Sequence, residues 1–96
     1  MICWMSDKTN DIIDRHGMRV IGFDLERESG DAWCAVELGD TSMIVRLGNV
    51  KGLEYHAIEM RFAASMLQFA IRAAEDGDNE GYEVLNELLD ELGRKE

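Results

Sequence analysis

Residues 53–75 read LEYHAIEMRFAASMLQFAIRAAE, and residues 76–92 continue as DGDNEGYEVLNELLDEL. The first segment has no glycine or proline and is rich in alanine, leucine and methionine, so it predicts one long helix over residues 53–75. Its polar side chains gather in a narrow stripe and most of the others are apolar, which indicates a helix covered on more than one side. Any apolar area left uncovered would suit a second copy or a partner.

A C-terminal amphipathic helix is predicted from about residue 80. At about 100° per residue, one arc of this helix is apolar, and it carries Tyr82, Leu85, Leu88, Leu89 and Leu92. A separate arc, here called the acidic stripe, carries Glu80, Glu83, Glu87, Asp90 and Glu91. The leucines are therefore expected to dock on a core while the carboxylates point away from it.

The N-terminal half predicts a short helix and three strands. Ser6 is a good N-cap and Gly17 a good stop, so residues 6–16 are expected to be helical. Strands follow at residues 19–27, 32–38 and 42–47, with Ile21, Phe23 and Leu25 expected on one side of the first. Short turns between the strands favour an antiparallel meander.

These elements predict a single α+β domain over residues 1–96, with the order α-β-β-β-α-α. The three-stranded meander is expected to pack against the long helix and the C-terminal amphipathic helix. Because the long helix has more apolar circumference than these two neighbours can cover, a homodimer is predicted. Its candidate interface residues are Tyr55, Phe62, Met66 and Phe69.

The net charge of −10 is concentrated at the C-terminal end, where residues 75–96 hold nine acids against Arg94 and Lys95. Nucleic acids and anionic membranes both attract a positive surface, so direct binding to either is not expected. Two interpretations of the acidic stripe stay open. It solubilises the protein, or it forms a negative patch aimed at a basic partner.

Cys3 and Cys34 are the only cysteines, and their separation matches no zinc-binding pattern. The apolar start of the chain is too short for a secretory signal, and no run is long enough to span a membrane. A cytoplasmic protein with both thiols reduced is therefore expected, with a Cys3–Cys34 disulfide as the alternative.

Residues 76–87 resemble an EF-hand calcium loop. Oxygen ligands stand at the required positions, with Gly81 at position 6, and these ligands are Asp76, Asp78, Glu80 and Glu87. Glu83, however, occupies a position that is normally aliphatic, and the leucine periodicity already implies helix from about residue 80. We therefore expect no metal or cofactor, and keep calcium binding as a minor alternative.

No catalytic motif accompanies these features. His56 and Glu59 lie one helical turn apart, but a metal site would need further ligands, and no nucleophile motif or phosphate-binding loop occurs. The chain is therefore not expected to be an enzyme. Trp33 alternates with Cys34 along its strand, so it is either an exposed hot spot for a partner or packs beneath the N-terminal segment.

The element order resembles that of double-stranded RNA-binding domains. Those domains open their last helix with lysines, whereas this chain has Leu53, Glu54, Tyr55 and His56 there, so RNA binding is not expected. In size, charge and element order the chain is also similar to small acidic secretion chaperones. In size, charge and lack of motifs it is similar to phage or mobile-element inhibitors, such as DNA-mimic, anti-restriction and anti-CRISPR proteins.

The resulting hypothesis is a non-enzymatic protein that uses the acidic stripe, with Trp33, to occupy a basic surface of a nucleic-acid-binding protein. The alternative is a dimeric chaperone or adaptor that binds a client through an apolar helix face. A single EF-hand-like calcium-binding protein is the second alternative.

Overall fold

The chain folds into three helices and one three-stranded sheet in a computed structural model that describes residues 4–93. Along the chain these are α1 (Asp7–Arg15), β1 (Arg19–Leu25), β2 (Asp31–Leu38), β3 (Thr41–Asn49), α2 (Tyr55–Glu75) and α3 (Glu80–Gly93). The predicted α+β class and the order α-β-β-β-α-α are confirmed. Within residues 4–93, no helix has the length and apolar character needed to cross a bilayer.

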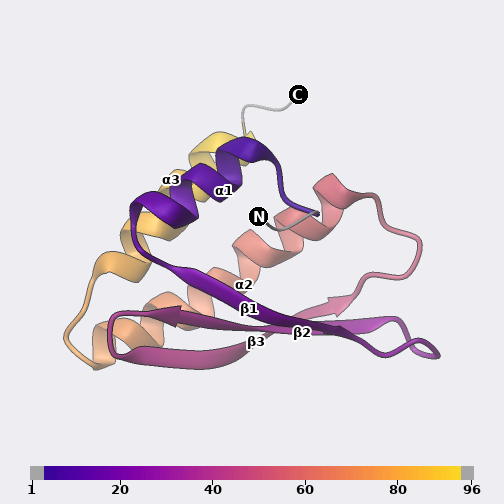
Figure 1. The fold of residues 1–96 in the computed structure, drawn as a ribbon, viewed down its shortest axis with the longest axis horizontal. Helices are drawn as coiled ribbons and strands as arrows, with labels where there is room; N and C mark the ends of the chain where they lie inside the picture. Colours follow the sequence, from indigo (N-terminus) through magenta and orange to yellow (C-terminus); the bar gives the residue numbers. More distant parts are fainter. Residues whose placement is uncertain (1–3, 94–96) are drawn as a thin grey trace.

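The sheet is an antiparallel meander with the strand order β1-β2-β3, as predicted. All three helices lie on one side of it (Figure 1). The strand residues that point toward the helices include Cys34, Val36 and Val45, none of which has any exposed surface. The alternate residues of the same strands therefore form an outer sheet face that no described element covers.

A bulge in β1 changes the expected facing of its apolar residues. Ile21 pairs with β2, but regular pairing resumes only at Asp24, which leaves Gly22 and Phe23 opposite a single β2 residue. Gly22 permits the bulge because it adopts a φ of 66°, where a side chain would be strained. The prediction that Ile21 and Phe23 share a face is therefore wrong. The Phe23 ring lies on the helix side of the sheet, where it stays 38% exposed and its centroid is 5.4 Å from that of Trp4.

Helix α2 forms the centre of the core. Phe62, Met66 and Phe69 are completely buried on the side of the helix that faces the interior. On a neighbouring side, α3 approaches α2 closely at Gly81, where an added Cβ would lie 3.0 Å from the Cα of Ala70. Small residues at this contact allow the leucines of α3 to reach the core.

Ser6 anchors the start of α1 through two hydrogen bonds, one at its hydroxyl and one at its backbone N–H. The Ser6 hydroxyl oxygen accepts a hydrogen bond from the Thr9 backbone N–H at 3.3 Å, as the N-cap prediction requires. The Ser6 backbone N–H in turn donates to Oε2 of Glu59 at 2.5 Å. Glu59 is only 2% exposed, so its carboxylate ties α2 to the start of α1 from inside the protein.

Two adjacent leucines of α3 provide a test of this packing. Leu88 has no exposed surface, whereas Leu89 is 52% exposed. Leu88→Ala is expected to lower the free energy of unfolding by about 2–5 kcal/mol, because it removes buried methyl groups and leaves a cavity. Leu89→Ala is expected to lower it by less than about 1 kcal/mol. Urea denaturation at low micromolar protein concentration measures both, and equal losses would contradict the packing of α3.

Candidate functional site

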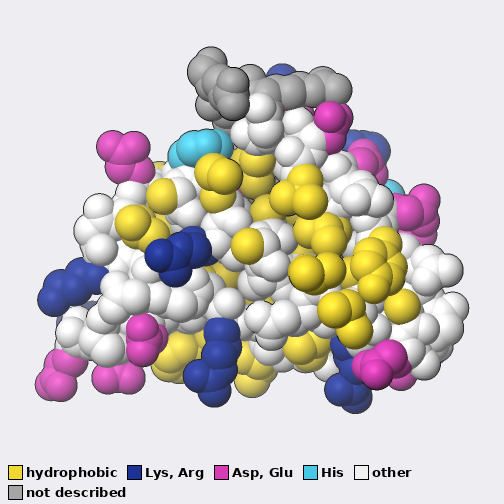
Figure 2. Space-filling view, turned by 180° about the vertical axis from the view of Figure 1, so that it is seen from behind, with side chains coloured by type: hydrophobic (Ala, Val, Ile, Leu, Met, Phe, Trp, Pro, Cys, Tyr) yellow, Lys and Arg dark blue, Asp and Glu magenta, His cyan; other side chains and the backbone are white. Residues whose placement is uncertain are grey.

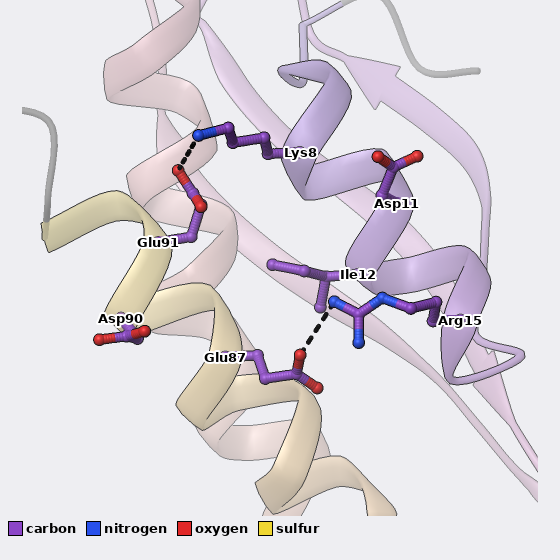
Figure 3. A pocket seen from close by; sticks show the side chains of 7 residues that line it. All are labelled: Lys8, Asp11, Ile12, Arg15, Glu87, Asp90 and Glu91. Atoms are coloured by element: carbon purple, nitrogen blue, oxygen red, sulfur yellow. Dashed lines mark hydrogen bonds and ion pairs between the residues drawn. The ribbon is translucent and has the colours of Figure 1, made fainter.

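The acidic stripe divides between two surroundings. Glu80, Glu87 and Glu91 lie on the side of α3 that faces α1. Glu83 and Asp90 are exposed, and Asp90 borders the groove between the two helices. Figure 3 shows two ion pairs across the groove between these helices. Nζ of Lys8 lies 3.9 Å from Glu91, and a guanidinium nitrogen of Arg15 lies 3.0 Å from Glu87.

The groove itself has a volume of about 250 Å³ and a mixed lining. Its walls carry both signs of charge and one aliphatic residue, namely Lys8, Asp11, Ile12, Arg15, Glu87, Asp90 and Glu91. Neighbouring cations from α1 therefore neutralise part of the stripe. The groove is therefore a charged contact between α1 and α3.

His16 adds a further contact between α1 and α3. It is the C-cap residue of α1, and its ring lies between two carboxylates of α3. Nδ1 hydrogen-bonds to Glu80 and Nε2 hydrogen-bonds to Glu87, while the side chain is only 13% exposed. The hydrogen bond to Glu80, followed by that to Glu87, raises the pKa of His16 above its usual value of 6.5.

Glu87 responds in the opposite direction. Its hydrogen bond with His16, assisted by Arg15, lowers the pKa of its carboxyl group below the usual 4.5. The protonated imidazole and the ionised carboxylate therefore stabilise each other. Because Glu80, Glu87 and Glu91 all contact bases of α1, less of the stripe is available to another protein than the sequence indicates. Its use in partner binding stays a prediction.

Trp33 lies on the outer sheet face and is half-buried. From Trp4 onward, the N-terminal segment does not cover it, because Trp4 packs into the core, where its ring centroid lies 5.7 Å from that of Phe62. Ile44 and Ile21 lie on the same outer face and are 63% and 39% exposed. Of the two alternatives for Trp33, the described residues favour a side chain on an uncovered face over one packed beneath the N-terminal segment.

The four predicted dimer-interface residues do not share a surface. Tyr55 is 64% exposed, but Phe62, Met66 and Phe69 have no exposed surface. The assignment of Phe62, Met66 and Phe69 to an interface is therefore wrong, because these residues lie on the side of α2 that fills the core. The assignment of Tyr55 stays a prediction.

Helix α2 nevertheless has a second apolar side, which is exposed. The surface formed by this side and the adjoining residues of α3 is here called the helical face. It consists of Met60, Leu67, Ile71, Tyr82 and Leu89. The expectation that some apolar circumference of α2 stays uncovered is thus met by residues other than those predicted.

The loop resembling an EF-hand is not folded as one. Helix α3 begins at Glu80, so its first residues are helical where a calcium loop would be extended around the ion. Oδ1 of Asp78 accepts a hydrogen bond from the Glu80 backbone N–H at 2.9 Å, and Oδ2 of Asp76 accepts one from the Thr41 hydroxyl at 3.0 Å. These carboxylates therefore cap α3 and connect the turn to β3. Among residues 4–93 no group of three or more potential metal ligands occurs.

The remaining reactive side chains are also enclosed or peripheral. Cys34 is a free thiol in the core, and burial raises its pKa to about 11, which disfavours the thiolate. Cys3, the other half of the disulfide considered above, lies outside the described residues. Nδ1 of His56 lies 3.7 Å from the buried carboxylate of Glu59. No pattern in the sequence indicates the role of Glu59, because a single glutamate on an apolar helix carries no periodic signal.

Comparisons with known proteins find no match to any family model, any curated protein or any solved structure.

The His16 contacts predict a specific pH dependence of stability. Because the folded-state pKa of His16 is raised, its contribution is complete below the unfolded value of about 6.5 and is lost as the pH rises through the folded value. We expect the free energy of unfolding to fall between pH 6 and pH 8.5, by at most about 1.4 kcal/mol per pH unit. Denaturation at several pH values measures this fall.

The matched variants are His16→Gln and His56→Gln. His16→Gln is expected to lower the free energy of unfolding at pH 6 and to make its decrease with pH smaller. His56→Gln leaves the His16 imidazole in place between α1 and α3, so the decrease with pH should remain. Wild-type stability that does not change from pH 6 to pH 8.5 would contradict the proposed contact.

Proposed function

We propose that this chain is a non-enzymatic protein-binding protein that recognises its partner through the outer sheet face around Trp33. The observation that carries the proposal is an apolar row across all three strands. Ile21 pairs with Ala35, and Ala35 pairs with Ile44, so the three side chains line up on one surface. No described element covers this row, and contiguous exposed apolar surface on a small protein is typical of interaction sites.

The neighbouring row adds polar specificity. Trp33 is flanked by Asp24 on β1 and Arg46 on β3, each directly across from it in the sheet. A pocket of about 360 Å³ is lined by Trp33, Ile44 and Arg46. Tryptophan and arginine are the residue types that most often dominate protein interfaces, because one buries a large ring and the other donates several hydrogen bonds.

This lining favours a partner segment of defined chemistry. A large apolar side chain would enter the pocket beside Trp33 and Ile44. A carboxylate or carbonyl oxygen next to it would accept hydrogen bonds from the Arg46 guanidinium. We therefore infer a protein segment that presents an apolar residue next to an acceptor. A nucleic acid ligand is disfavoured by the net charge of −10.

The absence of catalysis is part of the proposal and rests on the state of two reactive side chains. His16 is engaged by two carboxylates, and Cys34 is buried with a raised pKa. Neither is presented to a pocket with a nucleophile or an oxyanion-stabilising group around it.

An acidic inhibitor of a basic protein surface is the second candidate. It is favoured by Asp7, Asp11 and Asp14, which are exposed along α1 at helical spacing. Together with the exposed Glu83 of α3, they add negative charge beside the partly neutralised stripe. Such a surface would bind cationic grooves with strong salt dependence.

Two substitutions on the outer sheet face test the first candidate. Trp33→Ala and Ile44→Ser are expected to weaken binding of a partner captured from lysate at least tenfold, because they remove the apolar wall of the pocket. Ser42→Ala is the matched control on the same face of β3 and should bind as wild type. Calorimetry with the purified partner measures the affinities, and circular dichroism verifies the fold. Unchanged affinity of both pocket variants would refute the sheet face as the binding site.

A charge variant tests the second candidate. Asp11→Asn, Asp14→Asn and Glu83→Gln together remove exposed carboxylates while leaving Glu80, Glu87 and Glu91 in contact with α1. If the acidic surface binds the partner, this triple variant should associate more slowly than wild type. Its affinity should also fall less steeply as the salt concentration rises from about 50 mM to about 300 mM. If wild type and variant show equal affinities and salt slopes, the acidic inhibitor is excluded and the surface only solubilises.

A further inference from the structure

The helical face is the largest group of exposed apolar side chains on the helices. Met60, Leu67 and Ile71 of α2 are 51%, 49% and 47% exposed, and Tyr82 and Leu89 of α3 are 36% and 52% exposed. Figure 2, which views the molecule from behind, shows apolar side chains gathered into a broad patch on this side. No described element lies over it.

The sequence spacing explains why these residues form one surface. Residues 60, 67 and 71 recur at helical intervals on the side of α2 opposite Phe62 and Phe69, which fill the core. Tyr82 and Leu89 are two turns apart on α3. The close approach at Gly81 brings the two helices together, so their exposed apolar stripes join.

The dimensions suit a protein interface. Helix α2 has 21 residues, which corresponds to a length of about 30 Å. Two helices packed about 8–10 Å apart present a width of about 15–20 Å. Helix α3 has only 14 residues, or about 21 Å, so the two helices together present about 450 Å² in projection. This is more than half of the ~800 Å² that each partner of a standard-size interface buries.

The two edges of the helical face differ in charge. The α2 edge adjoins β3 and is here called the basic edge, because it carries the exposed Arg61 and Arg72. Nη1 of Arg61 donates to the Leu47 carbonyl at 3.2 Å, Nε of Arg72 lies 3.9 Å from Oδ2 of Asp76, and Glu75 adds a further acid at this end of α2. The α3 edge carries the acids Glu83 and Asp90. Because the exposed pair of Arg72 with Asp76 is long and screened by solvent, Arg72 can exchange it for a carboxylate on the acidic edge of a second copy.

This charge pattern distinguishes between two symmetric arrangements. Helices α2 and α3 run in opposite directions (Figure 1). A two-fold axis parallel to the helices places α2 of one copy over α3 of the other, so each basic edge meets an acidic edge. A two-fold axis across the helices places basic edge on basic edge and acidic on acidic, which is repulsive.

We propose that the helical face binds a second copy of this chain, with the two-fold axis parallel to α2 and α3. Leu67 and Ile71 of each copy bury against Tyr82 and Leu89 of the other. Arg72 and Glu83 are about equally distant from the turn between the helices, so Arg72 of one copy lies opposite Glu83 of the second. The dimer leaves both outer sheet faces uncovered, and the inference goes beyond the function proposed above without depending on it.

Sedimentation equilibrium of the full chain from low to high micromolar concentration tests the interface. The wild-type mass should approach twice the 10.9 kDa of one chain. Leu67→Glu should weaken association at least 100-fold, because it places a charge at the centre of the face. Ile44→Glu, which alters only the outer sheet face, is the matched control and should remain a dimer. Circular dichroism verifies that both variants fold.

A charge exchange tests the axis. Arg72→Glu and Glu83→Arg should each weaken the dimer about tenfold, because each puts like charges together, and the double variant should recover wild-type association. A wild-type protein that stays monomeric overturns the inference, as does a dimer lost in Ile44→Glu but kept in Leu67→Glu. A double variant no better than the single variants overturns the parallel axis. If Trp33→Ala loses partner binding but keeps the mass of the dimer, the result supports the sheet face as the partner site and a separate dimer interface on the helical face.

Discussion

The burial of Phe62, Met66 and Phe69 between the sheet and α3 is the interaction on which the rest of the structure depends. These side chains have no exposed surface, and every other layer is arranged around them. The inner sheet residues close the core from one side and the leucines of α3 close it from another. The contact of Gly81 with Ala70 sets how closely α3 can approach, because a Cβ at that position would meet the backbone of α2. Burial of large apolar side chains is the main favourable term in folding, so this layer outweighs the individual polar contacts.

The polar contacts determine how α1 is held rather than whether the core forms. His16 bridges Glu80 and Glu87, Arg15 and Lys8 reach further carboxylates of α3, and the buried Glu59 caps the start of α1 from α2. The exposed ion pairs contribute little individually. The enclosed imidazole and Glu59 matter more, because a buried polar group without its partner is costly. This arrangement also means that carboxylates which look free in the sequence serve the fold.

The two uncovered apolar surfaces follow from the small size of the domain. All three helices lie on one side of the three-stranded sheet, so its outer face is open. Helix α3 covers only part of the apolar circumference of α2. The outer face carries Trp33 with an arginine beside it, which suits a specific partner. The helical face carries apolar side chains between an edge with arginines and an edge with acids, which suits a copy of itself. The different chemistry of the two surfaces is the basis for assigning them different occupants.

The sequence alone determined the elements of this protein. Ser6 and Gly17 defined the first helix, the strand alternation defined the meander, and the leucine periodicity placed α3 from Glu80 and thereby argued against a calcium loop. These features are local, so propensity and periodicity reveal them. Tertiary structure decided which apolar side of α2 is buried, because Met60, Leu67 and Ile71 are as apolar as Met66 and Phe69 and only the neighbouring layers distinguish them. It also decided the facing of Phe23 through the bulge at Gly22, and the pairing of His16 with carboxylates more than 60 residues away. Contacts between distant residues depend on how the layers pack, and no local pattern in the chain encodes them.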